Sequence, residues 1–244
     1  IAAAGKIPFA STFAHFAAGR AFDQIRNSIA YPKLNVKICP THAGVSLGED
    51  GGSHQSVEDI ALMRSLPGMV VLSPADAVET EQMIFAVAEY KGPVYVRLGR
   101  LNVPVIFDET YEFEIGKGTV MIEGNDVAII ATGLLVYEAM KASEALAEKG
   151  IKVRVINMST IKPLDEKIVL EAAKECKFVV TCEEHSIIGG LGGAVAEYLS
   201  GAHPTKVIRH GIKDVFGQSG EGDQMLDEYK LRAKDIVEVV LQNM

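Results

Sequence analysis

Two histidines, two acids and four glycines lie within the stretch THAGVSLGEDGGSHQ at residues 41–55. Imidazole exchanges protons near neutral pH and a carboxylate accepts hydrogen bonds from hydroxyl groups, so His42, Asp50 and His54 could act on a polar substrate. The glycines allow the backbone to approach a ligand closely. The same composition also fits a solvated loop in which glycine and aspartate only form turns. Composition therefore leaves both interpretations open.

The position of this stretch favours a binding site. The apolar segment Asn35–Cys39 before it has the character of a strand, and His42 follows just beyond its carboxyl end. Ligands of open α/β sheets bind in the crevice at that end of the strands. We therefore expect the stretch to form a polar-substrate site at the edge of a sheet.

The rest of the first half predicts the elements of that sheet. Runs rich in Val and Ile alternate with segments of helical period, which is typical of βαβ units and parallel sheets. Strands are expected at Lys6–Ser11, Asn35–Cys39, Met69–Leu72 and Val94–Leu98, and helices at Ala14–Ala30, Val57–Leu66 and Ala77–Tyr90. The polar stretch Leu101–Glu114 has no clear period, so we interpret it as a linker.

The alternation of strands and helices restarts after this linker. Strands are expected at Asp126–Ala131, Lys152–Asn157, Phe178–Cys182 and Lys206–Ile208, and helices at Leu135–Lys149, Asp165–Cys176, Leu191–Leu199 and Leu231–Leu241. The sequence thus predicts an α/β protein of two domains, each a mostly parallel sheet with helices on both faces. We place the domains at residues 1–108 and 123–244, with a linker and domain entry at residues 109–122.

Composition limits the class of partner. The 244 residues carry a net charge of −8, so the clustered basic residues of a nucleic-acid footprint are not expected. No apolar run approaches the roughly 20 residues that span a bilayer, and the first residues do not resemble a signal peptide. The three cysteines form no CxxC pair, which fits buried thiols in a reducing compartment. We expect a cytoplasmic protein without membrane contacts.

The order of several motifs resembles one family. These motifs are TFxxF at residues 12–16, THxGxxxGEDGxxHQxxE at 41–58, SLPGMVVLSPADAVE at 65–79, GPVYVRLGR at 92–100 and VINMSTIKPLD at 155–165. Together they resemble the pyrimidine-binding and C-terminal domains of transketolase. In the first half of the chain the resemblance rests on four closely spaced motifs. In the second half it rests on the order of the expected elements and on the motif VINMSTIKPLD.

This resemblance implies a transferase of the pentose phosphate pathway. Transketolases move a two-carbon ketol unit from a ketose phosphate to an aldose phosphate and use thiamine diphosphate as an electron sink. In single-chain members a domain with a GDG motif precedes these two domains and holds Mg²⁺ and the diphosphate. The only Gly-Asp pair here, Gly222–Asp223, lies near the end, so the chain resembles the smaller subunit of a split transketolase.

The resemblance also implies an assembly. The active form would combine two copies of each subunit, with Mg²⁺ and the diphosphate on the partner subunit. The isolated chain would form an inactive homo-oligomer, a dimer or tetramer, through the surfaces that the partner covers. A glutamate that contacts the pyrimidine ring in the family matches no residue here, so we expect further sequence ahead of Ile1, disordered when the partner is absent.

Six residues match functional positions of the family. Phe13 and Phe16 match the aromatic residues that hold the aminopyrimidine ring, although two core phenylalanines at helical spacing would look the same. His42 and His54 match substrate-channel histidines that assist proton transfer, and Asp50 matches the acid that binds a substrate hydroxyl.

Two arginines close the GPVYVRLGR motif. Arg100 matches the residue that binds the sugar phosphate, and Arg97 is better explained as a structural ion-pair former.

Some features depart from the family or stay without a role. Ala43 stands where transketolases commonly carry Asp, and Gly52–Ser53 replaces Pro-Thr. The glycines at 189–193 fit a tight turn between strand and helix better than a phosphate site, and we assign no metal to Glu183–His185.

Other functions share this two-domain ending. The alternatives are a subunit similar to 1-deoxyxylulose-5-phosphate synthase, the β subunit of a 2-oxo-acid dehydrogenase, and a non-catalytic scaffold that kept the fold. The GEDGGSHQ stretch with both histidines favours a transketolase acting on sugar phosphates.

Overall fold

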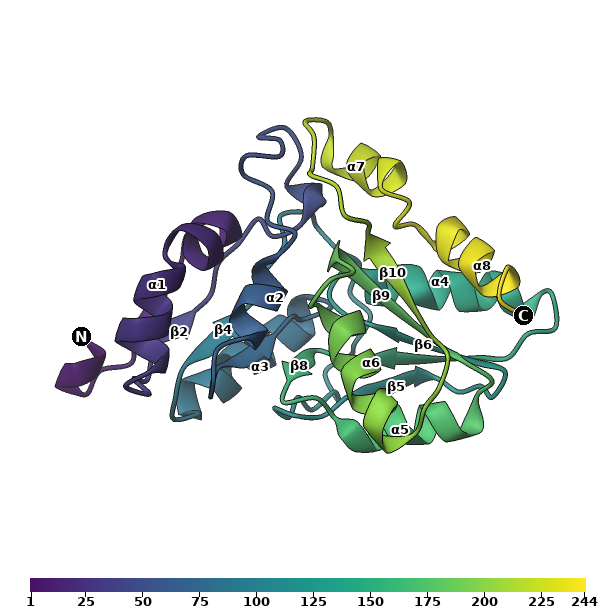
Figure 1. The fold of residues 1–244 in the computed structure, drawn as a ribbon, viewed down its shortest axis with the longest axis horizontal. Coiled ribbons are helices and arrows are strands. Elements are labelled where there is room, and N and C mark those ends of the chain that lie inside the picture. The colour runs from purple at the N-terminus through teal and green to yellow at the C-terminus, as the bar shows by residue number, and fades with distance from the viewer.

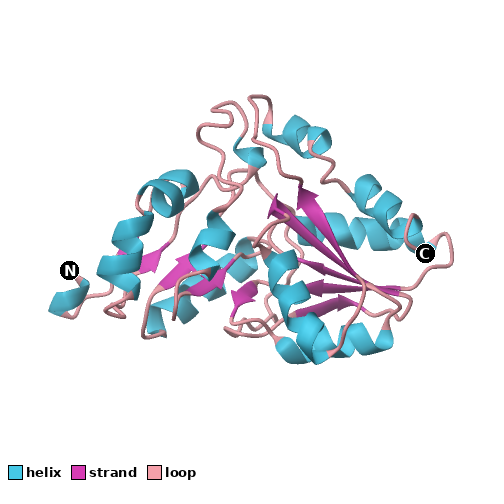
Figure 2. Ribbon diagram, in the orientation of Figure 1, coloured by secondary structure: helices cyan, strands magenta, loops and turns pink.

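The computed structural model describes residues 1–244 and confirms two α/β domains, each built on a five-stranded, mostly parallel sheet (Figures 1 and 2). The first sheet has the order β1-β2-β4-β3-β8 and the second the order β10-β9-β6-β7-β5. In both sheets only one edge strand, β8 or β5, runs antiparallel to its neighbour. No helix combines the length and apolar character needed to cross a membrane.

The first domain contains short strands and irregular helices. Its strands are β1 (Phe9–Ala10), β2 (Lys37–Ile38), β3 (Val70–Leu72) and β4 (Val94–Val96), with β8 (Thr160–Lys162) added from the second half. Its helices are η1 (Ala2–Ala4), η2 (His15–Arg20), α1 (Phe22–Gln24), η3 (Ile25–Ala30), η4 (Val45–Leu47), α2 (Asp59–Arg64) and α3 (Ala77–Glu89).

The second domain has longer elements. Its strands are β5 (Thr119–Ile122), β6 (Val127–Ala131), β7 (Val153–Asn157), β9 (Val179–Ser186) and β10 (Val207–Ile212). Its helices are α4 (Leu135–Ala147), α5 (Glu166–Glu175), α6 (Leu191–Ala202), α7 (Gly222–Glu228) and α8 (Ala233–Leu241).

Strand β6 shows why helices cover both faces of the second sheet. Its residues alternate between two cores: Val127, Ile129 and Ala131 pack with α4 and α8, whereas Ala128 and Ile130 pack with α5 and α6. A strand whose side chains are all apolar must be covered on both faces. Burying each of the larger aliphatic side chains contributes about 1.5–3 kcal/mol.

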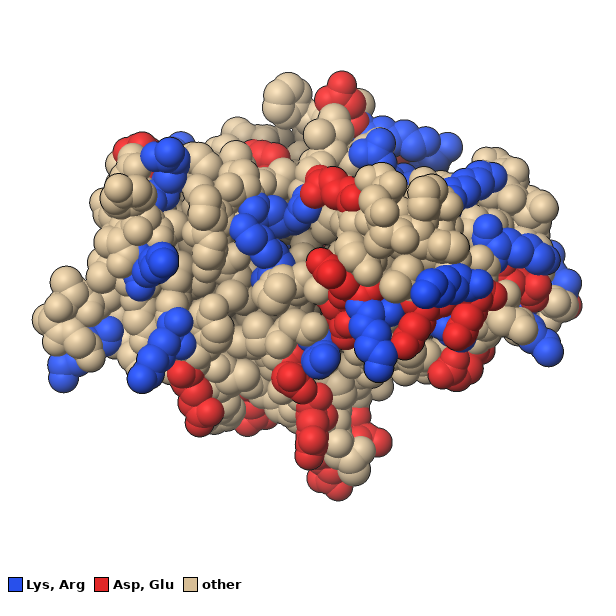
Figure 3. Space-filling view, turned by 60° about the horizontal axis from the view of Figure 1, so that its bottom comes forward, with Lys and Arg blue, Asp and Glu red and all other residues tan.

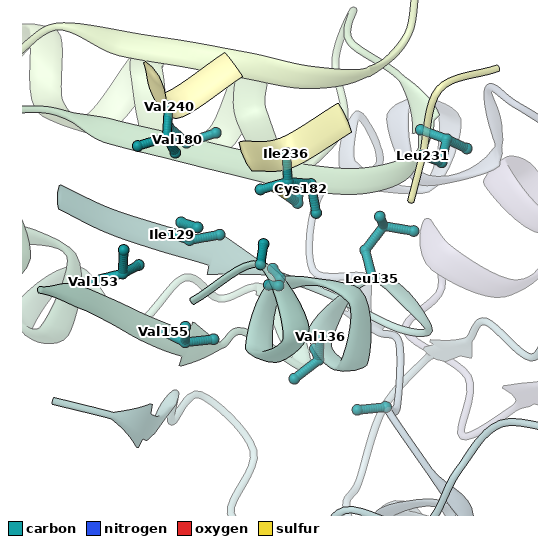
Figure 4. Close-up of a cluster of buried hydrophobic side chains, with 14 of the residues drawn as sticks. Ile129, Leu135, Val136, Val153, Val155, Val180, Cys182, Leu231, Ile236 and Val240 are labelled. Carbon is teal, nitrogen blue, oxygen red and sulfur yellow. The ribbon is translucent and has the colours of Figure 1, made fainter. Parts of the chain in front are cut away.

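The core beneath α8 joins strands and helices from distant parts of the chain. Figure 4 shows side chains of α8 facing Ile129 of β6 and Val180 of β9, with Leu135 and Val136 of α4 alongside. Val45, Ala75 and Phe107 of the first half belong to the same core. The two domains are therefore held together by a shared apolar core.

Strand β8 joins the domains a second time. It follows β7 in the chain but pairs with β3 of the first sheet, through Val71 with Lys162 and Leu72 with Thr160. The ammonium group of Lys162 donates to the carbonyl oxygens of Arg64 and Leu66, at 2.8 and 2.6 Å. The motif VINMSTIKPLD thus forms β7 and then crosses to the other domain.

The structure differs from the predicted elements in two respects. The single helix expected over Ala14–Ala30 is divided into η2, α1 and η3, of which η2 and η3 are wide π-type turns. The helical path is interrupted at Ala21, whose φ of −98° and ψ of 16° depart from helical values. The elements β5, β8 and α7 were not predicted, and β5 lies within the stretch assigned to linker and domain entry.

Candidate functional site

Three neighbouring strands of the first sheet deliver the predicted site residues to one edge. Phe13 follows β1, His42 follows β2 and Arg100 follows β4. These three strands are adjacent and parallel, so their carboxyl ends lie together. A further bridge between Phe13 and Thr41 continues the pairing of β1 and β2 into the site.

The two phenylalanines and two histidines form one aromatic cluster, composed of Phe13, Phe16, His42 and His54. The Phe13 ring stacks on His42 with 4.0 Å between centroids and lies parallel to Phe16 at 6.0 Å. The His54 ring meets Phe16 edge-on at 5.1 Å. All four side chains are only half-buried. The sequence-based alternative of two core phenylalanines is therefore a poor description of Phe13 and Phe16.

Each histidine of the cluster is held by the hydroxyl group before it. The Nδ1 atom of His42 lies 2.8 Å from Thr41 Oγ1, and that of His54 lies 2.9 Å from Ser53 Oγ. These contacts engage one ring nitrogen and leave Nε2 of both rings for another partner. His42 also has a backbone φ of 61°, a left-handed conformation that is uncommon for a residue with a side chain.

The surroundings of His42 favour its neutral form. Burial and the nearby Arg100 guanidinium lower its pKa, and Asp50 opposes that shift. Asp50 is exposed and has no hydrogen-bond partner among the side chains of the structure. The site therefore holds a neutral imidazole near a cation and a carboxylate, and a neutral imidazole can accept a proton.

Arg100 lies at the open side of this site. Its guanidinium donates to the carbonyl oxygen of Leu47 at 2.5 Å and pairs with the carboxylate of Glu49. The side chain is 39% exposed and that of Glu49 is 54% exposed. An ion pair so accessible to water is weak, so an anionic ligand can replace Glu49.

Arg97 has a different environment. Its Nε donates to Asp59 at 2.9 Å and its Nη2 to the carbonyl oxygen of Glu184 at 2.8 Å, and the Tyr95 hydroxyl also donates to Asp59 at 2.8 Å. Arg97 is 7% exposed and Asp59 is fully buried. These contacts support the interpretation of Arg97 as a structural ion-pair former.

The end of β9 places three titratable residues between the domains. Glu183 accepts the backbone N–H groups of Leu191 and Gly192 at 2.6 and 2.8 Å, so the protein's own carboxylate occupies the start of α6. Burial raises the pKa of Glu183 to about 7 and lowers that of His185 to about 4. Glu184 accepts the backbone N–H of Ser46 in the other domain at 2.7 Å. The backbone N–H groups after the glycine-rich turn are thus already bound by Glu183.

Sequence analysis had given no role to Asp59 or Glu184. For Glu184 the sequence carries a signal, since Glu183 and Glu184 directly follow the apolar residues at the start of β9. Burying a carboxylate at such a position is unfavourable unless it has hydrogen-bond partners. The structure holds no group of three or more His, Cys, Asp or Glu side chains arranged to ligate a metal ion.

A cavity of about 430 Å³ lies between the domains, next to Arg97 and Glu184. None of its lining residues belongs to the aromatic cluster, which instead lies on an open face. On the face drawn in Figure 3, basic and acidic side chains form small groups of both signs, so this face carries no continuous basic surface.

Comparisons with known proteins cover nearly the whole chain. Residues 1–105 match the family described as transketolase, pyrimidine binding domain, and residues 116–236 match that described as transketolase, C-terminal domain. A protein of Methanocaldococcus jannaschii named as a transketolase C-terminal section is 52% identical over 100% of this chain and 77% of its own length. Human transketolase is 36% identical over 96% of this chain but only 38% of its own length.

Two further relatives are subunits of divided enzymes. A 6-deoxy-6-sulfo-D-fructose transketolase subunit of a Clostridium species is 43% identical over 97% of this chain and 74% of its own length. A solved structure described as a split gene transketolase, inactive β4 tetramer, superposes with a TM-score of 0.93 at 51% identity, covering 99% of this chain and 77% of that chain. The chain belongs to the transketolase family and comprises its pyrimidine-binding and C-terminal domains.

Proposed function

We propose that the chain is one subunit of a transketolase that transfers a two-carbon ketol unit from a ketose phosphate to an aldose phosphate with thiamine diphosphate. The observation that carries this proposal is the convergence of Phe13, Phe16, His42 and His54 at one sheet edge. Arg100 stands beside this cluster with an exchangeable ion pair. Side chains that could bind a ring, transfer protons and bind an anion therefore lie at the same sheet edge.

The aromatic cluster fits the pyrimidine ring of the cofactor. Phe13 and Phe16 have ring planes only 2° apart and remain half-buried, so they offer apolar surface to a flat heterocycle. Bound thiamine diphosphate would supply the electron sink that makes the two-carbon unit transferable. We assign Mg²⁺ and the diphosphate to the partner subunit, because single-chain members of the family hold them on the domain that precedes the two domains present here.

His42 and His54 would move protons on the sugar. Their Nδ1 atoms are held by hydroxyl groups, which directs Nε2 toward the substrate. The lowered pKa of His42 keeps its ring unprotonated, so Nε2 would be free to accept the proton of a donor hydroxyl as the carbon–carbon bond breaks. Asp50 would accept a hydrogen bond from a further sugar hydroxyl and so select its stereochemistry.

Arg100 would bind the sugar phosphate. A guanidinium forms two parallel hydrogen bonds to phosphate oxygens, and the exposed Glu49 can release it without leaving a buried charge. The phosphate would therefore fix the far end of the substrate while the histidines act at the reacting end.

A partner subunit would complete the active site. Two relatives that align over most of their own length are described as a subunit or a section of a transketolase, and one solved relative is described as an inactive β4 tetramer of a split gene transketolase. We infer that this chain also forms an inactive homo-oligomer alone and a heterotetramer, two copies of each subunit, with a diphosphate-binding partner.

A reconstitution assay tests the proposal. The chain is mixed with its diphosphate-binding partner, thiamine diphosphate and Mg²⁺, and ketol transfer between sugar phosphates is measured, with each component omitted in turn. Transfer should require all components and should be lost in His54→Ala but kept in His203→Ala, a histidine remote from the cluster at the end of α6. Equal activity of the two variants would contradict the assignment.

A further inference from the structure

The segment Asp214–Glu221, which joins β10 to α7, lies against the histidine-containing loop at residues 48–55, and we call this segment the clasp. Figure 1 shows the two segments side by side, although they come from different domains. The Nε2 of Gln55 donates to the carbonyl oxygen of Gln218 at 2.9 Å, and the Ser219 hydroxyl donates to that of Glu49 at 2.6 Å. The C-terminal domain thus contacts the loop that carries Asp50 and His54.

The clasp and the loop approach each other closely at two glycines, where there is no space for a Cβ atom. A Cβ atom on Gly217 would lie 1.7 Å from the Oε1 atom of Gln55, and one on Gly52 would lie 2.5 Å from the carbonyl oxygen of Gly217. Real Cβ atoms do not approach other atoms so closely, so a side chain at Gly52 would require a backbone shift and one at Gly217 would displace the Gln55 amide.

Gln55 links the two segments. It is 3% exposed, and its Nε2 also donates to the carbonyl oxygen of Val45 at 2.9 Å. Carbonyl acceptors on both segments fix which end of the amide carries the NH₂ group. Because His54 directly precedes Gln55 in the chain, a shift of the loop backbone at Gln55 would also displace His54.

The clasp is itself held in place by the C-terminal domain. The Tyr229 hydroxyl donates to the carbonyl oxygen of Phe216 at 3.0 Å, and α7 packs against η4. A Cβ on Gly222 would lie 2.6 Å from the carbonyl oxygen of Ser46. The clasp is therefore attached to the second domain through Tyr229 and α7.

We propose that the clasp and Gln55 are positioning elements of the transfer reaction, which set Asp50 and His54 for the sugar. This rests on the proposed function. Because catalysis is sensitive to displacements of about 1 Å, a shifted loop should cost roughly 10–100-fold in kcat/KM. The cofactor ring should be affected much less than the sugar, because Phe13 and Phe16 lie on another segment and meet the loop only through the edge of the His54 ring.

Two variants test this proposal. Gly217→Ala introduces a methyl group at the contact, and Gly201→Ala is its control, since a Cβ at Gly201 meets no atom within 4 Å. Hydrogen–deuterium exchange of the full chain should show faster exchange at residues 47–56 in Gly217→Ala only. Hydrogen–deuterium exchange does not depend on enzyme activity. It therefore tests whether the clasp holds the loop even if the proposed function is wrong.

Kinetics of the complex with the partner subunit give the second readout. Gly217→Ala should lower kcat/KM for the sugar roughly 10–100-fold and leave the affinity for thiamine diphosphate within about twofold of wild type. Unchanged exchange and kinetics, or an equal loss of cofactor affinity, would overturn the proposal. If Gly217→Ala does not fold, Gln55→Met is measured instead and judged by the same criteria. Methionine has a similar volume but cannot form the hydrogen bonds of Gln55 to Val45 and Gln218.

Discussion

Replacing Arg97 by methionine should destabilise the protein far more than the same change at Arg100. Arg97 is 7% exposed, and its loss leaves the fully buried Asp59 carboxylate with only the Tyr95 hydroxyl as a partner. Removing one member of a buried ion pair costs about 3–5 kcal/mol. Arg100 pairs with Glu49 in water, where an ion pair contributes about 0–1 kcal/mol.

Thermal unfolding measures the difference. For a chain of this size each kcal/mol shifts the midpoint by about 2–4 °C, so Arg97→Met should lower the midpoint by roughly 6–20 °C and Arg100→Met by a few degrees at most. Both variants are compared with wild type at equal protein concentration, because self-association changes the apparent midpoint.

A double variant separates the buried charge from lost packing. Asp59→Asn retains an oxygen for the Tyr95 hydroxyl but carries no charge, so Arg97→Met with Asp59→Asn should recover about 1–3 kcal/mol relative to Arg97→Met alone. Equal midpoints for Arg97→Met and Arg100→Met, or no recovery in the double variant, would refute the reasoning.

Three further predictions concern the site and the domain boundary. His42→Ala and His54→Ala should each lower turnover of the reconstituted complex by roughly 10²–10⁴-fold, and unchanged turnover in both would remove them from the reaction. Arg100→Met should raise KM for phosphorylated sugars by roughly 10–100-fold and leave kcat nearly unchanged, whereas an equal loss with unphosphorylated acceptors would argue against phosphate binding. Burial holds the folded-state pKa of His185 at about 4, below its value near 6.5 in the unfolded chain, so the unfolded chain binds the extra proton and stability should fall by roughly 3 kcal/mol as pH drops from 6.5 to 4. In His185→Gln the unfolding midpoint should change less between pH 6.5 and pH 4 than in wild type. An equal change in the two proteins would contradict this role of His185.

Local patterns in the sequence were sufficient to predict most of the second domain. Runs such as VAIIA in β6 are apolar on both faces, and they can be buried only in a sheet covered by helices on both sides. The order of motifs around Phe13, His42 and Arg100 likewise predicted the group of residues that the structure brings to one edge. Their roles in the reaction stay predictions.

Contacts between distant segments were beyond these patterns. Strand β8 has three residues, and its pairing with β3 depends on a partner from the other domain. Gln55 and Gln218, which join the loop to the clasp, are 163 residues apart. The sequence separates Arg97 from Arg100 only through the family resemblance, and the structure supplies the physical difference, because Arg97 is buried against Asp59 whereas Arg100 is partly exposed.

Carbon-13 tracing of the transferred unit tests the central claim most directly. The chain is combined with its partner subunit, thiamine diphosphate and Mg²⁺, and supplied with a ketose phosphate labelled at C1 and C2 and an unlabelled aldose phosphate. The proposed function predicts that both labels appear together at C1 and C2 of the new ketose, with no release of CO₂, and that transfer stops when the partner is omitted. Labels that remain in the donor, or a product that forms only from a decarboxylated 2-oxo acid, would contradict it.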